Sequence, residues 1–559
     1  MNQIILAHDA SGPVLASDEG ISFWGGVNAE TGVVQDAHHP WHGQSIAGKV
    51  LLMPTSRGSC SGSGVLLELA MNGLAPAALV FHQPEDILTL GAFIAGRMYD
   101  KPVAVVRLTE ADFDRLSTCA SITMNGHNLQ AEDLLLALTP LATDQLELSD
   151  NDLAMVRGDD GLAAQLAMEA IQVLGAAQGA TRLIDVTRGH IDGCIYAGPA
   201  NLAFAEAMEK MGARVTIPTS MNAISVDLER WQDHGVPDFF GAPASRLAQA
   251  YVEMGARPTF TCAPYLNDTD TPQAGEHIGW SESNAVIYAN SVLGARTVKH
   301  ADFFDLFVAM TGRAPLAGVY LDKNRRAQVR LKIEMPKGND TAIWPLIGWL
   351  AGQESPDCVP LLEGLEGAEI SEDDLKGLCA AFGTTSAAPL LHIAGITPEG
   401  MMPPAPNTDV RHITKAMMAV AWEQLNSGPE QVDLVALGSP HFSLSETRCF
   451  AEHLANRECA EHVTTVITLG RETFAAAESE GLVDRLETLG VRILRDLCWC
   501  SISEPLFPPK ARHLVTNSGK YAHYAPGLSG RTVRYAGLEH CASAAVTGRL
   551  EKGLPDWLQ

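Results

Sequence analysis

The sequence predicts a multi-domain α/β protein built mainly on parallel sheets. Short apolar runs typical of buried strands alternate with helical segments along most of the chain, a pattern that favours doubly wound sheets. The 559 residues exceed what a single hydrophobic core supports, so we expect two or three domains. Fifty glycines and 31 prolines supply the tight turns that such an alternation requires.

Residues 1–145 are expected to form the first, smaller unit. Its buried strands are predicted at 49–54, 77–81 and 102–108, and the helices between them at 64–73 and 85–98. The composition then becomes polar and acidic over residues 146–161, and exposed charged segments of this kind are typical of domain junctions. We therefore place a boundary near residue 145, followed by a larger unit at 146–559 that contains two α/β lobes.

The larger unit continues the alternation. Its predicted strands are 182–193, 214–227, 258–261, 388–395, 432–441, 464–470 and 491–500. Its predicted helices are 162–175, 243–254, 285–293 and 411–425, with two more from Ser445 and Glu472. Pro243 would then lie in a first helical turn, where its missing N–H costs nothing. Ser281 or Ser283 could cap the helix that starts at Ala285.

Polar and thiol side chains follow many of these strands. Cys262 ends the strand 258–261, and the loop after it carries Glu276 and His277. Other such residues are Arg188, His190, Asp192, Thr219, Ser220, Asn222, Ser439, His441, Cys498 and Cys500. Taken alone, each is better explained by a structural role. Because open α/β sheets bind ligands at the carboxyl ends of their strands, one crevice could nevertheless collect them all.

The turn from Thr55 to Gly64, TSRGSCSGSG, contains only Gly, Ser and Cys after Arg57. Its backbone N–H groups could form an anion nest at a helix N-terminus, suited to a carboxylate. A plain Ser/Gly-rich cap is one alternative. Another is a nucleophile elbow in which Cys60 serves a thiol hydrolase. The general base would then come from the upstream residues Asp36, His38, His39 and His42.

A second polar turn, TNSGKYAHYAPG, lies near the end of the chain. Its Asn517, Ser518 and Lys520 could hold a carboxylate or a phosphate, although the spacing of a P-loop is absent. A plain turn is an equal alternative.

The net charge argues against two classes of binding partner. With 66 acidic and 39 basic residues, the formal charge is −27. Binding to nucleic acid or to an anionic membrane surface depends on Lys and Arg, so neither partner is expected. No apolar run approaches the roughly 18 residues of a membrane span. The first residues lack the pattern of a secretory signal, so we expect a cytoplasmic protein.

Eleven cysteines in a reducing compartment are core residues, metal ligands or nucleophiles. Structural zinc is poorly supported, because Cys498 and Cys500 lack the two-residue gap of zinc ribbons and no second paired motif exists. Single cysteines dispersed at strand ends would suit an iron–sulfur cluster with an open coordination site.

Several long segments resemble the aconitase X family over nearly the whole chain. They include SRGSCSGSGVLLEL, IPTSMNAISVDLERW, TFTCAPYL, GEHIGWSESNAVIYANSVLGARTVK, GSPHFS, DLCW and TNSGKYAHYAPG. Archaeal members of the family have a large subunit and a small swivelling one, and the part resembling the small subunit is here fused ahead of the large one. This single-chain arrangement resembles the bacterial branch, which dehydrates cis-3-hydroxy-L-proline. The two-subunit branch is similar to mevalonate 5-phosphate dehydratase.

The resemblance implies Cys262 and Cys498 as cluster ligands. The third family position lies in a Gly-Cys-Pro-His pattern, but here Ser439 replaces the cysteine. This difference favours a 2Fe–2S centre with Ser439 as an additional ligand, and Cys500 is a second candidate. The family's catalytic serine falls in the serine-rich turn at residues 55–64, with Ser59 as first choice and Ser61 and Ser63 as alternates.

In the implied reaction, Ser59 removes the α-proton of a hydroxy amino acid while iron binds the 3-hydroxyl. Arg57 and the backbone nest would assist the serine, and a carboxylate such as Glu276 or Asp227 would receive the ring ammonium. The candidate substrate-binding residues are Arg57, Ser61, His190, Asn222, Glu276, His277, Asn517, Ser518 and Lys520. Alternative functions are dehydration of a phosphorylated hydroxy acid, an iron-sensing or RNA-binding role, and thiol hydrolysis. The enzyme is expected to act as a monomer or homo-oligomer.

Overall fold

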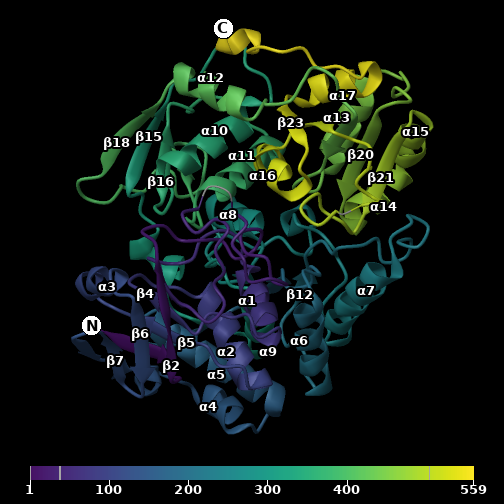
Figure 1. The fold of residues 1–559 in the computed structure, drawn as a ribbon. Helices are drawn as coiled ribbons and strands as arrows, with labels where there is room; N and C mark the ends of the chain where they lie inside the picture. The colour runs from purple at the N-terminus through teal and green to yellow at the C-terminus, as the bar shows by residue number, and fades with distance from the viewer. Residues whose placement is uncertain (1, 37–38, 503) are drawn as a thin grey trace.

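The computed structural model describes residues 2–36, 39–502 and 504–559 (Figure 1). The described residues form five sheets, most of whose strand pairs are parallel, and helices separate most of the strands. The predicted α/β class is therefore confirmed. The division at residue 145 stays a prediction.

The first unit is built on a nine-stranded sheet of order β8-β7-β6-β2-β3-β4-β5-β1-β9. Its strands are β1 (Gln3–Leu6), β2 (Ala10–Ala16), β3 (Val50–Leu52), β4 (Ala78–Phe81), β5 (Ala104–Arg107), β6 (Ser121–Asn125), β7 (Asn128–Ala131), β8 (Leu134–Ala137) and β9 (Thr139–Pro140). Its helices are α1 (Gly62–Met71), α2 (Ile87–Tyr99) and α3 (Glu110–Ser117). The three predicted strands are confirmed as the parallel neighbours β3, β4 and β5. The serine-rich turn therefore leads from β3 into α1.

A short parallel sheet of order β12-β11-β13 begins the larger unit, beside the antiparallel pair β10 and β14. The strands are β10 (Leu183–Asp185), β11 (Gly189–Ile191), β12 (Thr219–Met221), β13 (Gly279–Trp280) and β14 (Arg313–Pro315). The helices are α4 (Asp150–Arg157), α5 (Leu162–Ala177), α6 (Pro199–Lys210), α7 (Asp238–Glu253), α8 (Ser283–Ser291) and α9 (Phe304–Thr311). The segment 182–193, expected to be one strand, thus divides between two sheets.

The strand predicted at 258–261 is wrong. Pro258 has no N–H to donate, and Phe260 has a φ of +42°, so the segment cannot continue a regular ladder. Arg257 alone forms a bridge, to Ser220. Thr259 replaces the missing pairing with its side chain, which exchanges two hydrogen bonds of 2.9 Å with the backbone of Met221. Cys262 is therefore held at the end of β12 by an extended segment rather than by a strand.

Three helix starts also differ from prediction. Helix α7 begins at Asp238, so Pro243 lies inside it. Helix α8 is capped by Glu282, whose carboxylate accepts the N–H of Asn284, and not by Ser281 or Ser283. The first residues of the predicted helix 411–425 belong instead to the strand β18 (Asp409–Ile413), and the helix, capped by Thr414, begins at residue 415.

Two further parallel sheets complete the chain. One, of order β17-β16-β15-β18, contains β15 (Val329–Ile333), β16 (Pro360–Glu363), β17 (His392–Ile393) and β18 (Asp409–Ile413), with α10 (Ile343–Glu354), α11 (Glu372–Thr385) and α12 (Lys415–Gln424). The other contains β19 (Leu434–Leu437), β20 (Thr464–Leu469), β21 (Val491–Arg495), β22 (His513–Thr516) and β23 (Thr532–Tyr535), with α13 (Leu444–Leu454), α14 (Arg471–Ser479), α15 (Leu482–Thr488), α16 (Gly519–Ser529) and α17 (Leu538–Thr547).

The last sheet has the order β21-β20-β19-β22-β23, so successive strands are added on one side of β19 and then, from β22, on the other, while all of them stay parallel. Such a switch point leaves a crevice at the carboxyl ends of the two strands. Ser439 follows β19 and Ser518 follows β22, which places both residues at this crevice.

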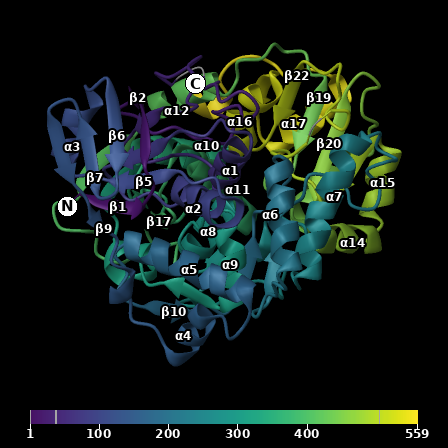
Figure 2. The same cartoon turned by 60° about the horizontal axis from the view of Figure 1, so that its bottom comes forward.

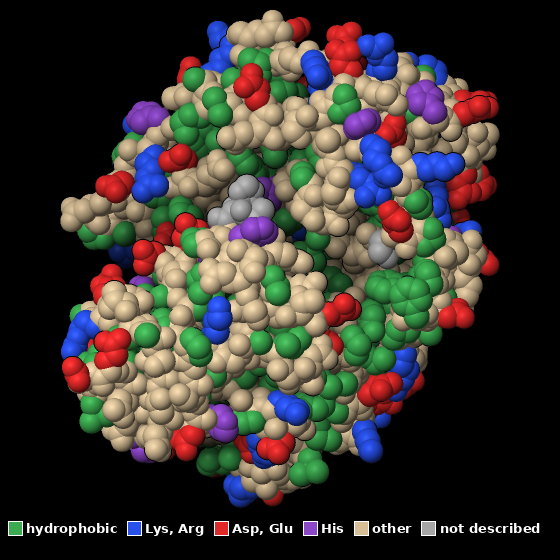
Figure 3. Space-filling model, viewed as in Figure 1, with side chains coloured by type: hydrophobic (Ala, Val, Ile, Leu, Met, Phe, Trp, Pro, Cys, Tyr) green, Lys and Arg blue, Asp and Glu red, His purple; other side chains and the backbone are tan. Residues whose placement is uncertain are grey.

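The first unit packs directly on the next part of the chain, as Figures 1 and 2 show. Helix α1 contacts α6, and α2 contacts α5. The carboxylate of Glu68 on α1 accepts the N–H of Ala200 at 2.6 Å, and Arg107 donates to the carbonyl of Ala177 at 2.6 Å. The face seen in Figure 3 is hollowed where the upper half of the molecule meets the lower half. Among the described residues, no helix combines the length and apolar character required to cross a membrane.

Replacing Gly348 with alanine should destabilise the protein, because an added Cβ would lie 2.2 Å from the carbonyl oxygen of Leu378 where α10 packs on α11. Overpacking of this kind costs about 1–3 kcal/mol, against a gain of about 1 kcal/mol in helix propensity. Gly383→Ala in α11 is the matched control, because its Cβ would meet only the flexible end of Ile287. Equal thermal denaturation midpoints for the two variants would contradict this packing.

Candidate functional site

The three parallel strands of the small sheet each deliver one polar side chain to the same edge. Asp192 follows β11, Asn222 follows β12, and Glu282 lies two residues beyond β13. The amide of Asn222 donates to the Asp192 carboxylate and, at 3.2 Å, to Glu282. All three residues are buried. The carboxyl edge of this sheet thus collects polar side chains, as expected for parallel strands.

Lys520 joins this group from the last sheet. It lies in the first turn of α16, and its Nζ is 2.8 Å from Glu282 Oε1. Burial favours the neutral amine, but Glu282 and the nearby thiols outweigh it and raise the pKa of Lys520 well above its usual value. Burial alone would raise the pKa of Glu282, yet Lys520 holds it below its ordinary value. The two groups therefore form a charged pair in the interior.

Three cysteines and one serine converge next to this pair. Cys262, Cys498 and Cys500 pack together around Ala223. Ser439 Oγ lies 3.8 Å from the Cys498 sulfur and 3.9 Å from the Cys500 sulfur. The structure therefore brings together every metal ligand expected from the sequence, together with the second candidate Cys500.

The chemistry of these side chains fits iron. Hydrogen bonds from Cys262 and Cys500, together with the charge of Lys520, hold the pKa of Cys498 well below its usual value, whereas burial and the bond with Cys498 raise the pKa of Cys262. The thiolate is the form of cysteine that binds metal, and sulfur ligands are those that iron–sulfur clusters use. The group of four could hold a metal ion or an iron–sulfur cluster.

His441 ties the ligand segments to one another. Its backbone N–H donates to Cys262 Sγ at 3.3 Å, and its ring nitrogens lie 3.2 Å from Thr261 Oγ1 and 2.6 Å from the carbonyl oxygen of Leu497. The ring thus joins the residues that precede Cys262 and Cys498. This buried histidine has a positioning role.

The serine-rich turn of the first unit docks on the loop after β13 and on residues 299–302. Cys60 Sγ donates to the carbonyl of Ser281 at 3.2 Å, and Lys299 donates to the carbonyl of Gly58 at 3.1 Å. Ser63 Oγ donates to the carbonyl of Asp302 at 3.1 Å. These contacts anchor the small unit at the edge that carries Glu282.

Within this turn, Ser59 Oγ donates to Ser61 Oγ at 3.3 Å. Asp302 is buried beside Ser61 and Asp192, and burial raises the pKa of its carboxyl to about 7. The sulfur of Cys60 and one carboxylate oxygen each of Asp192 and Asp302 all lie within 4.8 Å of one another. These three residues could also hold a cation. On the other side of Asp192, hydrogen bonds run through Asn222 and Glu282 to Lys520.

Arg57 points elsewhere. Its guanidinium lies 3.6 Å from Glu19 and 3.5 Å from Asp36, and 46% of its side chain is exposed. Arg57 was expected to assist Ser59, but it forms ion pairs with two carboxylates of its own unit instead.

Glu276 and His277 have other partners too. Glu276 pairs with Arg188 at 2.8 Å and accepts from Thr187 at 2.5 Å. His277 is half-buried with its ring edge against Tyr320. None of these partners belongs to the group around Lys520.

His190 lies beneath the site, with Nδ1 2.8 Å from Ser220 Oγ. Its Nε2 has no partner among the described residues. Burial lowers the pKa of His190 to about 3, so the ring is neutral and has no proton to give at neutral pH. Asp227 instead approaches Arg495, at 3.6 Å.

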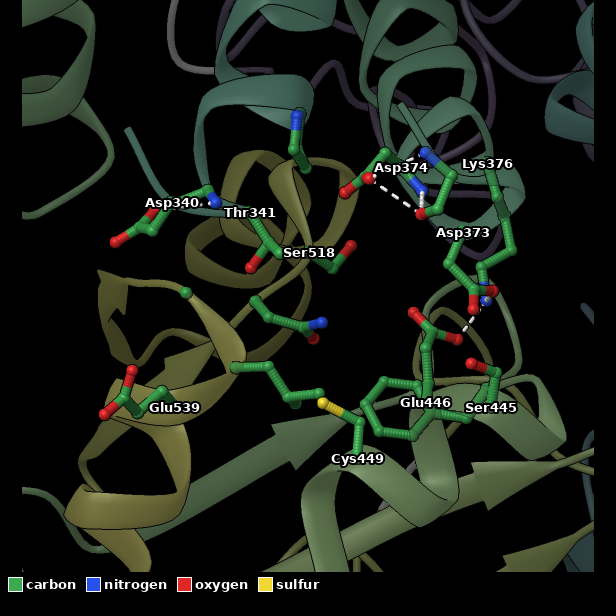
Figure 4. Close-up of a pocket in the computed structure, with 18 of the residues that line it drawn as sticks. Asp340, Thr341, Asp373, Asp374, Lys376, Ser445, Glu446, Cys449, Ser518 and Glu539 are labelled. Carbon is green, nitrogen blue, oxygen red and sulfur yellow. Dashed lines mark hydrogen bonds and ion pairs between the residues drawn. The ribbon is translucent and has the colours of Figure 1, made fainter. Parts of the chain in front are cut away.

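Asn517 and Ser518 line a cavity of about 370 Å³ that also reaches Ser439. Figure 4 shows acidic side chains around it and the pairing of Lys376 with Glu446. Ser518 donates to the carbonyl of Ser439. These two candidates thus lie beside the ligand group, at the switch point of the last sheet.

The nucleophile elbow is not supported. Cys60 is fully buried, and burial raises the pKa of its thiol well above the usual value. His39 and His42 contact the carbonyls of Glu19 and Asp36, and His38 lies outside the described residues.

Two carboxylates of the site were missed from the sequence. Glu282 lies two residues past β13, a two-residue strand that was not predicted from the sequence. Asp302 lies in a loop between α8 and α9 that no predicted strand precedes, so the sequence carries no signal for it.

Comparison with known proteins places this geometry in a family. Models of the aconitase X domains match the chain in four parts: the swivel domain at residues 1–131, the first domain at 145–323, the second at 327–423 and the third at 432–547. A protein from Pseudomonas aeruginosa named cis-3-hydroxy-L-proline dehydratase is 46% identical, over 99% of this chain and 97% of its own length. One of the same name from Hypocrea jecorina is 42% identical, over 98% and 95%.

A solved structure agrees with the sequence matches. The crystal structure of Thermococcus kodakaraensis aconitase X in its holo-form superposes with a TM-score of 0.65 at 30% identity, covering 71% of this chain and all of that one. The chain therefore belongs to the aconitase X family.

Proposed function

We propose that the protein is a hydro-lyase that dehydrates cis-3-hydroxy-L-proline to Δ1-pyrroline-2-carboxylate. The observation that carries the proposal is the convergence of Cys262, Cys498 and Ser439 beside the Lys520–Glu282 pair, with the serine turn docked on the carbonyl of the neighbouring Ser281. The two relatives that carry this activity in their names match the chain almost end to end.

The buried charges favour an amino acid over a phosphorylated substrate. A phosphate requires several cationic or N–H donors. Around the site, the carboxylates Asp192, Asp302 and Glu282 are all buried, and Lys520 is already paired. Such an interior suits the ring ammonium of a zwitterion. The net charge of −27 likewise opposes an RNA-binding role.

A 2Fe–2S centre held by Cys262, Cys498 and Ser439, with Cys500 as an alternative ligand, is the cofactor that these side chains suit best. When bound, it would supply a Lewis acid that makes the 3-hydroxyl a better leaving group. Every described cysteine is free of disulfides, in keeping with a cytoplasmic enzyme. We expect it to act as a monomer or homo-oligomer.

The residues of the chain perform the remaining steps. Ser59 removes the α-proton, and the N–H of Ser61, 3.3 Å from Ser59 Oγ, stabilises charge that develops on that oxygen. An N–H of Lys520 that is not donated to Glu282 would bind the single carboxylate of the substrate. The enamine that forms on loss of water tautomerises to the imine product. Packing of the first unit over the site excludes solvent from the reacting atoms.

Replacing Cys262 or Cys498 with alanine should abolish iron binding and dehydration together, because each removes a thiolate ligand. Cys379→Ala is the control, since this thiol is equally buried but packs in the core around α11. Iron content, the visible spectrum and pyrroline formation, measured on anaerobically purified protein, are the readouts. Full dehydratase activity in Cys262→Ala would refute the ligand assignment.

Ser59→Ala should slow both dehydration and exchange of the α-proton by about 10²–10⁴-fold, the usual contribution of a placed base. Ser63→Ala should have a much smaller effect, because Ser63 bonds only to the carbonyls of Cys60 and Asp302. Incorporation of deuterium at the α-carbon in D₂O measures the step directly. Normal exchange in Ser59→Ala would remove it as the base.

Lys520→Met should destabilise the fold by about 3–5 kcal/mol, because it leaves Glu282 as a buried, uncompensated charge. The double variant Lys520→Met/Glu282→Gln should recover most of this loss. Thermal denaturation of the wild type, both single variants and the double variant forms a complete cycle. Losses that simply add would show that the two charges do not interact.

A further inference from the structure

A second cavity lies at the seam between the first unit and the larger one. Its volume is about 540 Å³, within the range of pockets that hold small organic molecules. Pro84 and Asp86 of the first unit form part of its wall, and the larger unit forms the rest. Neither Ser59, nor Lys520, nor any cysteine of the ligand group lines it. A molecule bound in this cavity is therefore not placed for the proposed reaction.

The charge that lines this cavity is opposite to that of the protein. Lys299, Lys323 and Arg326 all line it, and among the described residues Asp86 supplies the one carboxylate of the lining. The chain as a whole carries a formal charge of −27. A cleft lined by a local excess of one charge concentrates ions of the opposite sign. The ligand expected from this lining is therefore an anion.

Two of the three cations have no partner within the described part of the chain. Asp322 directly precedes Lys323, but its carboxylate pairs with Arg296. Neither Lys323 nor Arg326 forms a side-chain hydrogen bond or an ion pair there, and both residues are exposed. Their N–H donors are therefore available to a ligand.

Three amide side chains complete the polar lining, those of Gln178, Asn324 and Gln328. Gln178 donates to Asp86 at 2.6 Å, and Asn324 donates to the carbonyl of Gly318 at 2.8 Å. Each of these two amides keeps its oxygen as an acceptor. An amide oxygen accepts from a hydroxyl group and offers nothing to a fully ionised phosphate. The lining thus suits a ligand that carries both an anionic group and hydroxyl groups.

We propose that this cavity binds a small organic phosphate that carries hydroxyl groups. Three cationic side chains match the charge and the three terminal oxygens of a phosphate monoester, whereas a carboxylate offers two oxygens and a single charge. Binding of such a molecule does not depend on the dehydration proposed above.

The cavity is also linked to the serine-rich turn. Lys299 donates to the carbonyl of Gly58 at 3.1 Å, and its ammonium has two further N–H groups for a phosphate. Glu85, next to Asp86, accepts from Ser56 Oγ at 2.6 Å. Because both units contribute to the wall, a bound phosphate favours the arrangement in which the first unit is docked. Binding should therefore raise the thermal denaturation midpoint.

The test is isothermal titration calorimetry on the full-length holoenzyme at constant ionic strength, with ribose 5-phosphate, inorganic phosphate and ribose as probes. Ribose 5-phosphate should bind saturably and more tightly than the other two, and should raise the denaturation midpoint. Lys323→Gln/Arg326→Gln should weaken its binding about 100-fold, from about 10-fold for each charge-assisted contact. The rate of dehydration without the phosphate should be unchanged in this variant.

Two further variants separate the cavity from the overall charge of the protein. Lys332→Gln/Lys337→Gln removes the same charge from exposed lysines that do not line the cavity, and should bind like the wild type. Ala387→Trp keeps every cation but fills the cavity, and should lose binding. Absence of saturable binding to the wild type, or equal weakening in the two double variants, would overturn the proposal. Inorganic phosphate or ribose bound as tightly as ribose 5-phosphate would overturn the organic phosphate as the ligand.

Discussion

The ion pair between Lys520 and Glu282 is the constraint around which the site is arranged. Glu282 lies beyond β13 in the small sheet, and Lys520 follows β22 in the last sheet, so the pair exists only when the two sheets face each other with their carboxyl ends together. A buried charge without its partner costs several kcal/mol. This cost penalises other arrangements of the two sheets and holds the strand ends that carry Asn222, Cys498 and Ser439 around one volume.

The sequence predicts the parts of this site that depend on strand ends. The rule for strand ends predicts that Cys262, Cys498 and Ser439 lie together, and the structure places them close to one another, although an extended segment rather than a strand leads to Cys262. The resemblance to the family supplied their role as ligands. The surrounding α/β class followed from the alternation of strands and helices alone.

What the sequence could not predict depends on contacts between distant loops. Glu276 and Glu282 stand six residues apart in the same polar segment, and only the fold shows that Arg188 engages the first while Lys520 engages the second. Asp302 enters the site from a loop without any strand pattern. Arg57 looked like the natural partner of Ser59, but two carboxylates within its own unit pair with it instead.

Buried carboxylates lie between the two parts of the site that take part in the proposed reaction. Asp192, Asp302 and Glu282 lie between the serine turn and the thiols, whereas Lys520 is the cation that faces them. A substrate that brings its own positive charge relieves this excess, and one that brings a phosphate increases it. Burial, and then the repulsion among these carboxylates, raises the pKa of Asp192 and Asp302. One cluster of buried carboxylates therefore favours, in the proposed reaction, a zwitterionic substrate over a phosphorylated one.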